Sequence, residues 1–134
     1  MRIKIDTKER FKVVTILEPV LTARLAAEFL EILKKGHEAD SSSAESFTHL
    51  VVVMSEVQEI EKETSTSLAS IQQEFYAQHH SFVYCGLQPS VVAALSQAGV
   101  YEMMNITPTE SEAWDILQME EIERELLNDS EEKE

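Results

Sequence analysis

The chain has 134 residues, of which 43% are hydrophobic, and its 25 acidic and 11 basic residues give a formal net charge of −14. That excess of carboxylates argues against binding to nucleic acid or to an anionic membrane surface, and no apolar stretch is long enough for a transmembrane helix. The composition suits one globular domain, expected in the cytoplasm because the first residues contain no apolar signal region.

The first third of the sequence predicts a hairpin followed by a helix. Polar and apolar residues alternate at residues 2–6, and residues 11–17 are rich in β-branched side chains, so both segments are expected to be strands. Thr22 is a candidate N-cap for the next helix, which could equally start one turn later. The helix is expected to end at Lys35, because Gly36 then occupies the position after the last turn. The polar segment that follows, residues 37–46, is expected to be a mobile surface loop.

The remaining sequence alternates between strand and helix patterns. The apolar run at residues 48–54 predicts a strand covered on both faces. Further strands are expected at residues 81–85 and 101–106, and helices at residues 64–80, at residues 91–97 and from Pro108 onward.

The predicted order is therefore β-β-α-β-α-β-α-β-α. Alternating strands and helices indicate an α/β fold with a mostly parallel sheet. A single domain is expected over residues 1–127, followed by a disordered acidic tail at residues 128–134.

A candidate working surface lies at residues 55–71, where the most apolar strand leads through a polar loop into a helix. Ligands and partners of open α/β sheets are met at the carboxyl ends of strands, and helix N-termini favour negative charge. The hydroxyls of residues 64–67 exceed what one helix cap requires, so phosphorylation there is a possibility.

Signatures of catalysis and of cofactor binding are largely absent. The three glycines are isolated, so no phosphate-binding loop is predicted, and no closely spaced Cys/His set suggests a metal site. Cys85 ends a predicted buried strand and is interpreted as a core residue. Glu59, Glu61 and Glu63 could serve acid–base chemistry or metal binding, but a solvated acidic loop is the favoured interpretation. No catalytic residue, metal or cofactor is therefore assigned.

Several segments in their order and spacing resemble the STAS family, the sulfate transporter and anti-sigma factor antagonist domain, and in particular its stand-alone bacterial antagonists. The resemblance covers about residues 3–127. The matching segments are the strand at residues 11–17 with Leu21-Thr22-Ala23, the run at residues 50–57 (LVVVMSEV), Gly86 to Val91 (GLQPSV), residues 95–106, Pro108-Thr109, Glu112-Ala113 and the acidic helix at residues 119–126.

The resemblance implies a mixed sheet of about five strands flanked by helices, and a non-catalytic protein-binding function. Antagonists of this family bind an anti-sigma factor kinase, which phosphorylates a serine in an Asp-Ser-Ser-Gly loop at the start of the second helix. In this chain the loop aligns with Glu61-Lys62-Glu63-Thr64, so Glu63 occupies the position of the phosphorylated serine.

This loop departs from the family pattern. Glu61, Lys62, Glu63, Thr64, Ser65 and Thr66 are predicted to form the partner-binding loop, and Thr64, Ser65 and Thr66 remain possible phosphoacceptors because the alignment can shift by a residue or two. The family's Gly-Gly before the next strand is replaced by His79-His80. A degenerate antagonist is expected, either locked in a phosphorylated-like state or released from the kinase.

Three functions are compatible with the sequence. The favoured one is a protein-interaction module in partner-switching regulation of transcription, with a kinase-like anti-sigma factor or another protein of the pathway as partner. The first alternative is a small-ligand or nucleotide-binding module, or an enzyme, that uses residues 59–67. The second is a subunit of a sensory complex that docks through its acidic last helix.

Overall fold

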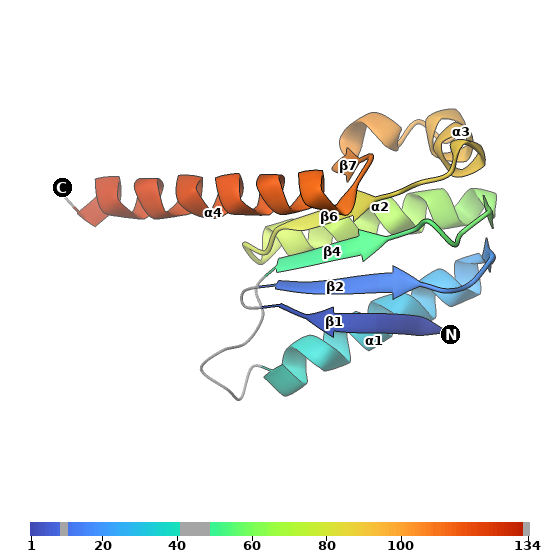
Figure 1. Cartoon of the computed structure of the whole chain (residues 1–134), viewed down its shortest axis with the longest axis horizontal. Coiled ribbons are helices and arrows are strands. Elements are labelled where there is room, and N and C mark those ends of the chain that lie inside the picture. The colour runs from blue at the N-terminus through green and yellow to red at the C-terminus, as the bar shows by residue number, and fades with distance from the viewer. Residues whose placement is uncertain (9–10, 41–48, 133–134) are drawn as a thin grey trace.

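The computed structural model of the chain describes residues 1–8, 11–40 and 49–132 (Figure 1). Within these residues, five strands form one sheet in the order β1-β2-β4-β6-β7. The strands are β1 (Ile3–Thr7), β2 (Phe11–Ile16), β4 (His49–Val53), β6 (Phe82–Cys85) and β7 (Ile106–Thr107). Only β1 is antiparallel to its neighbour, so the predicted mixed sheet of about five strands is confirmed.

Helices cover both faces of the sheet. Val14, Val52 and Tyr84 belong to the larger core, with residues of α1 (Ala23–Asp40), α2 (Lys62–Ala77) and α3 (Pro89–Gln97). Their immediate neighbours in the strands point the other way and pack against Ala113 and Leu117 of α4 (Glu110–Glu132). This alternation explains why the inner strands are apolar at nearly every position.

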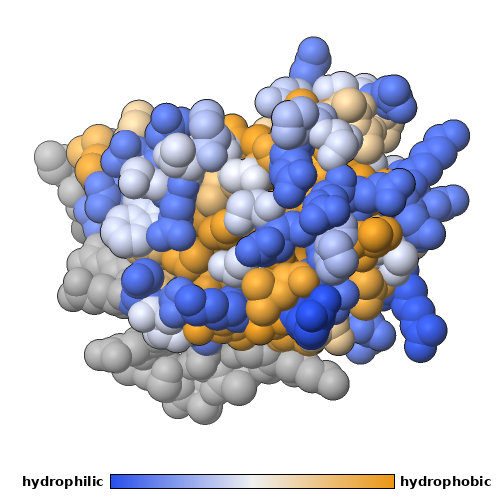
Figure 2. Space-filling view, turned by 45° about the vertical axis from the view of Figure 1, so that its right-hand side comes forward, coloured by the Kyte–Doolittle hydropathy of each residue, from blue (hydrophilic) through white to orange (hydrophobic). Residues whose placement is uncertain are grey.

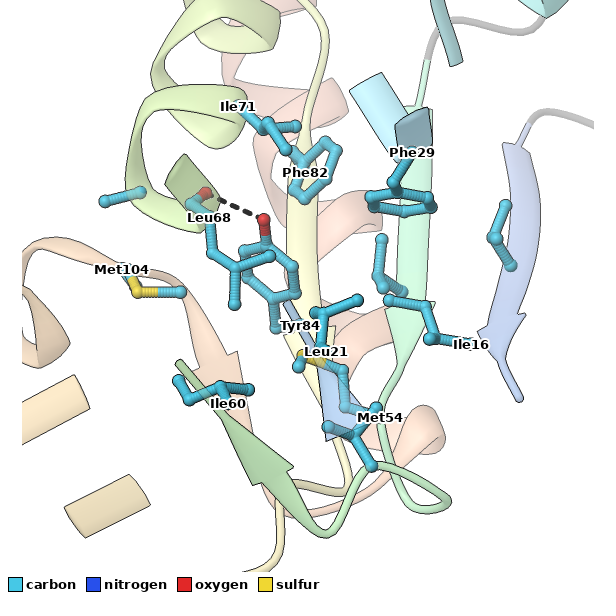
Figure 3. Close-up of a cluster of buried hydrophobic side chains, with 14 of the residues drawn as sticks. Ile16, Leu21, Phe29, Met54, Ile60, Leu68, Ile71, Phe82, Tyr84 and Met104 are labelled. Carbon is cyan, nitrogen blue, oxygen red and sulfur yellow. Dashed lines mark hydrogen bonds between the residues drawn. The ribbon is translucent and has the colours of Figure 1, made fainter. Parts of the chain in front are cut away.

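The larger core is centred on aromatic side chains of β6 (Figure 3). Phe82 lies between Phe75 and Tyr84, with ring centroids 4.9 and 5.0 Å away. The hydroxyl of the fully buried Tyr84 donates a 2.7 Å hydrogen bond to the carbonyl of Leu68 in α2. This bond satisfies a polar group that would otherwise be costly to bury, and it fixes α2 against the sheet.

Several predicted element boundaries were wrong. α1 continues through Gly36 to Asp40, so the expected loop does not begin at His37, and residues 41–46 of that loop lie outside the described residues. α2 begins at Lys62 rather than Thr64, and α4 extends to Glu132, into the segment expected to be disordered. Residues 101–103 form a 3₁₀ turn, which leaves a strand only at residues 106–107.

A second, two-stranded sheet was not predicted. β3 (Val20–Leu21) pairs in parallel with β5 (Glu59–Ile60). Two residues are too few to produce a recognisable alternation of polar and apolar side chains, so the sequence contains no periodic signal for these strands.

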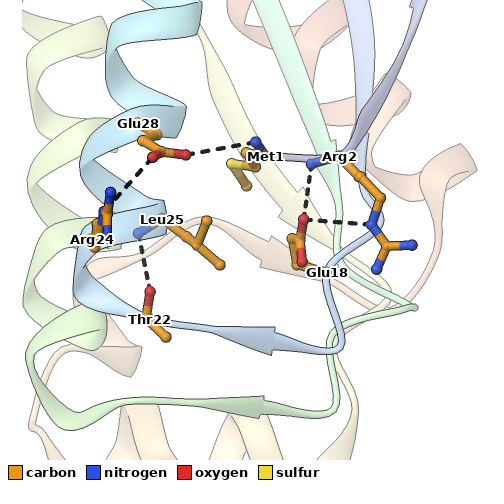
Figure 4. A network of polar contacts seen from close by, with 7 residues as sticks. All are labelled: Met1, Arg2, Glu18, Thr22, Arg24, Leu25 and Glu28. Carbon is orange, nitrogen blue, oxygen red and sulfur yellow. Dashed lines mark hydrogen bonds and ion pairs between the residues drawn. The ribbon is translucent and has the colours of Figure 1, made fainter.

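The predicted N-cap of α1 is confirmed. The hydroxyl of Thr22 accepts a hydrogen bond from the backbone N–H of Leu25 at 3.1 Å (Figure 4). Beside it, the carboxylate of Glu18 accepts a 2.9 Å hydrogen bond from the backbone N–H of Arg2, and this bond lowers the pKa of Glu18. The surrounding ion pairs involve exposed arginine side chains and contribute little stability.

His79 ends α2 in a conformation that favours glycine. Its φ is 66°, and the backbone N–H groups of His79 and His80 bond to the carbonyls of Tyr76 and Phe75 at 3.0 and 2.9 Å. This pattern is a Schellman motif, whose left-handed residue is usually Gly. The His79-His80 pair thus adopts a backbone turn to which glycine is better suited.

The substitution His79→Gly is expected to raise the free energy of unfolding by about 1 kcal/mol, because glycine has no Cβ to clash in the left-handed region. Urea denaturation measures the change. Gln78→Gly is the matched control: Gln78 has a φ of −98°, so glycine there should lower stability. A loss of stability in both variants would show that the conformation of His79 is not strained.

Candidate functional site

The loop between β4 and α2 lies at the carboxyl end of the parallel strands and is joined to the start of α1. The backbone N–H groups of Gln58 and Glu59 both donate to the carbonyl of Pro19, at 2.8 and 3.1 Å. Together with the β3–β5 ladder, these bonds place the N-termini of α1 and α2 near one another. The surface predicted from strand–loop–helix reasoning is therefore an ordered structure rather than a free loop.

The turn after β6 supports the same loop from the other side. The side-chain amide of Gln88 donates to the carbonyl of Ser55 at 2.9 Å, and the hydroxyl of Ser90 donates to the carbonyl of Gln58 at 2.6 Å. Gly86 has a φ of +70°, and a Cβ added there would lie 3.6 Å from the Cβ of Ser55. Residues 86–90 thus set the position of residues 55–58, a role that sequence reasoning missed.

Glu61 connects the two helices. It occupies the N-cap position of α2, but its carboxylate does not cap its own helix. The Oε1 atom instead accepts a 2.9 Å hydrogen bond from the backbone N–H of Ala23, the first residue of α1. A carboxylate at that position satisfies an unpaired N–H and interacts favourably with the helix dipole. Glu61 therefore has a structural role in addition to its place at the surface.

Thr64 and Ser65 face the protein interior. The side chain of Thr64 is fully buried, and its hydroxyl donates a 2.9 Å hydrogen bond to the carbonyl of Leu21. The hydroxyl of Ser65 is also buried and has no hydrogen-bond partner among the described residues. Phosphorylation of either residue would require the first turn of α2 to open.

The substitution Thr64→Val is expected to lower the free energy of unfolding by about 1 kcal/mol, because valine keeps the shape of threonine but removes the donor. The Leu21 carbonyl keeps its other bond, from the N–H of Glu61 at 3.2 Å, which limits the loss. The control is Ser67→Ala, since the hydroxyl of Ser67 makes only an exposed 3.3 Å bond to the Glu63 carbonyl. Equal stability of wild type and Thr64→Val in urea would contradict this account.

Four of the predicted site residues have exposed side chains: Glu61, Lys62, Glu63 and Thr66. Glu63 lies in the first turn of α2, where a negative charge is favoured by the helix dipole. Of the predicted phosphoacceptors, only Thr66 is exposed in the folded chain. The structure thus places Glu63 and Thr66 outside and Thr64 and Ser65 inside, because Thr64 and Ser65 lie one helical turn before the buried Leu68 and Ala69.

Some apolar surface lies beside these polar residues. Val20 of β3 is 41% exposed, and a hollow between α2 and α3 is lined by Ile60, Lys62, Ala94, Gln97 and Ala98. Seen in space-filling form from the side that carries these strand ends, the molecule shows hydrophobic patches between hydrophilic side chains (Figure 2). A surface of mixed apolar and charged character is suited to protein binding.

The described residues show neither a cluster of metal-ligating side chains nor a reactive thiol. They contain no group of three or more His, Cys, Asp or Glu side chains that could hold a metal ion. Cys85 is buried, and its burial, with a smaller effect of Glu110, raises its pKa to about 11, so the thiol stays protonated at neutral pH.

None of the helices in the described part of the chain is long and apolar enough to cross a membrane.

Comparison with protein families gives a match to the STAS domain over residues 2–113. No curated protein matches the chain in a sequence search. Similar solved structures include a serine-to-glutamate variant of RsbS from Moorella thermoacetica, with 22% identity and a TM-score of 0.68, covering 88% of this chain and 96% of that one.

Two further structures show how widely this fold occurs. A putative anti-sigma factor antagonist from Thermotoga maritima has 16% identity and a TM-score of 0.68, covering 87% of this chain and 94% of that one. The murine anion transporter Slc26a9 has 18% identity and a TM-score of 0.67. The match covers 85% of this chain but only 18% of the transporter, so this chain corresponds to one part of that protein.

Proposed function

We propose that this chain, which belongs to the STAS domain family, is a non-catalytic protein-interaction module in a partner-switching pathway that regulates transcription. The solved structures with a similar fold support this proposal, since they include anti-sigma factor antagonists and a component of the stressosome, described as a signal integration and transduction hub. The proposed partner is a kinase-like anti-sigma factor or another protein of the same pathway, encountered in the cytoplasm.

The observation that carries the proposal is the exposed carboxylate of Glu63 in the first turn of α2. By the family resemblance, this position belongs to the phosphorylated serine. A glutamate carries one negative charge, whereas a phosphoserine carries about −1.5 to −2 and has more acceptor oxygens. Residue 63 therefore carries a permanent negative charge that is smaller than that of phosphoserine. This position cannot be switched by phosphorylation.

Binding to the kinase-like anti-sigma factor of the same organism tests the proposal. Isothermal titration calorimetry would compare the wild type with Glu63→Lys, which reverses the charge at the start of α2. The matched control is Asp6→Lys in β1, near the opposite end of the sheet (Figure 1). We expect Glu63→Lys to change the dissociation constant by about tenfold or more and Asp6→Lys to leave it within about twofold.

Two results would count against the proposed function. One is a failure of the wild-type chain to bind any anti-sigma factor of its organism. The other is equal binding by the wild type and Glu63→Lys, which would place the partner on a different surface. Circular dichroism and urea denaturation of both variants would verify that the fold is kept, as expected for exposed side chains.

A further inference from the structure

The second half of α4 extends beyond the sheet. Ala113 and Leu117, in the first half of this helix, are buried against β2, β4 and β6. Further along, Arg124 is directed toward the body of the protein, where its Nη1 atom donates a 2.9 Å hydrogen bond to the hydroxyl of Ser81. The end of the helix projects past the strands (Figure 1). The helix face opposite Leu117 is therefore turned away from the domain.

That outer face carries an exposed apolar stripe. Met119, Ile122 and Leu126 are 60%, 55% and 61% exposed. Their spacing of three and then four residues places them in a line along one side of the helix, as at the a and d positions of a coiled coil. Large apolar side chains gathered in this way on a surface indicate a binding site.

The flanks of the stripe are acidic. Glu123 and Glu125 are exposed and border it in the positions that correspond to e and g of a heptad. Glu112 and Asp115, also exposed, continue the outer face toward the start of the helix. The one cationic residue in the α4 sequence is Arg124, which is bound to Ser81. Among the described residues of α4, the outer face thus combines apolar side chains with carboxylates and carries no positive charge.

We propose that this outer face of α4 docks an amphipathic helix of a partner protein whose apolar stripe is flanked by Lys or Arg. Such a helix would cover Met119, Ile122 and Leu126 and would place its cations beside Glu123 and Glu125. A second copy of this chain would bring carboxylates against carboxylates and is disfavoured. Because the stripe is short, the contact is weak by itself, with a dissociation constant of about micromolar or higher.

The surface is separate from the one around Glu63. α2 packs on the face of the sheet that carries the larger core, and α4 packs on the opposite face. A chain with two such surfaces can hold one partner through α2 and a second through α4. The inference does not depend on the proposed function, since it rests on α4 alone.

Two synthetic helical peptides test the proposal. Both carry Leu at the a and d positions of three heptads, one with Lys and the other with Glu at e and g, and fluorescence anisotropy measures their binding. Wild type should bind the Lys peptide at least about tenfold more tightly than the Glu peptide. The triple variant Met119→Gln, Ile122→Gln, Leu126→Gln should lose about tenfold in affinity for the Lys peptide although its net charge is unchanged.

Control variants separate the expected result from simple charge attraction. Asp6→Lys should bind the Lys peptide as wild type does, whereas Glu123→Lys with Glu125→Lys should lose the preference for it. Equal binding by wild type and the triple variant would overturn the proposal, because attraction by the acidic chain as a whole would then be sufficient. Failure of wild type to bind either peptide would overturn it too. So would a wild-type dimer in analytical ultracentrifugation that the triple variant abolishes, which would identify a second copy as the occupant.

Discussion

The substitution Phe82→Ala is expected to lower the free energy of unfolding by about 3–5 kcal/mol. Phe82 is fully buried in β6 and contacts both Phe75 of α2 and Tyr84, so alanine removes apolar burial, two aromatic contacts and the packing between the sheet and α2. Since the stability of a domain of this size is only about 5–15 kcal/mol, the variant should be close to unfolded at 37 °C.

Denaturation in urea or guanidinium chloride, followed by circular dichroism, measures this loss. Met119→Ala is a suitable control because Met119 is 60% exposed, and its stability should stay within about 0.5 kcal/mol of wild type. A loss below about 1 kcal/mol for Phe82→Ala would contradict the central place of Phe82 in the core. The proposed binding surface at the start of α2 depends on this core, because α2 is held against the sheet through Phe75, Leu68 and Ile71.

The substitution Glu63→Ser is expected to restore phosphorylation by the anti-sigma factor kinase of the pathway. The side chain at residue 63 is exposed in the first turn of α2, so a serine hydroxyl there would be accessible to the enzyme and its phosphate would be stabilised by the helix N-terminus. Incubation with kinase and ATP, followed by mass spectrometry, should show phosphate on Ser at residue 63 in the variant and none in the wild type.

Glu63→Ala is the matched control, because it removes the carboxylate without supplying a hydroxyl and should remain unmodified. High occupancy of phosphate on Thr66 in the wild type would contradict the non-switchable interpretation, since Thr66 is the exposed candidate among the predicted phosphoacceptors. Phosphate on Thr64 or Ser65 would show in addition that the first turn of α2 opens, because both side chains are buried in the folded chain.

Much of the fold could be predicted because its signals are periodic and long. The run at residues 50–53 is apolar at every position, and the structure confirms a strand covered on both faces. The order of strands and helices and the resemblance to the STAS family led to the five-stranded mixed sheet. Element boundaries were harder to predict. Gly36 suggested the end of a helix, but α1 continues to Asp40, because a single glycine destabilises a helix by only about 1 kcal/mol.

The sequence points to the start of α2 as the candidate site, but it does not give the arrangement of the side chains there. The burial of Thr64 and Ser65 was missed, although each lies four residues before a buried side chain, Leu68 or Ala69, and so on the same face of α2. The bond from Ala23 to Glu61 joins residues 38 positions apart, and no local pattern encodes it. The β3–β5 pairing that brings these residues together is equally invisible in sequence periodicity.

Hydrogen–deuterium exchange of the chain, alone and in complex with the kinase-like anti-sigma factor of its pathway, tests the central claim most directly. If the chain is a protein-interaction module that binds through the start of α2, amide exchange should slow within residues 55–71 on complex formation and stay unchanged in β1, an edge strand that β2 separates from β4. A complex that forms while the exchange of residues 55–71 remains as in the free chain would contradict the claim.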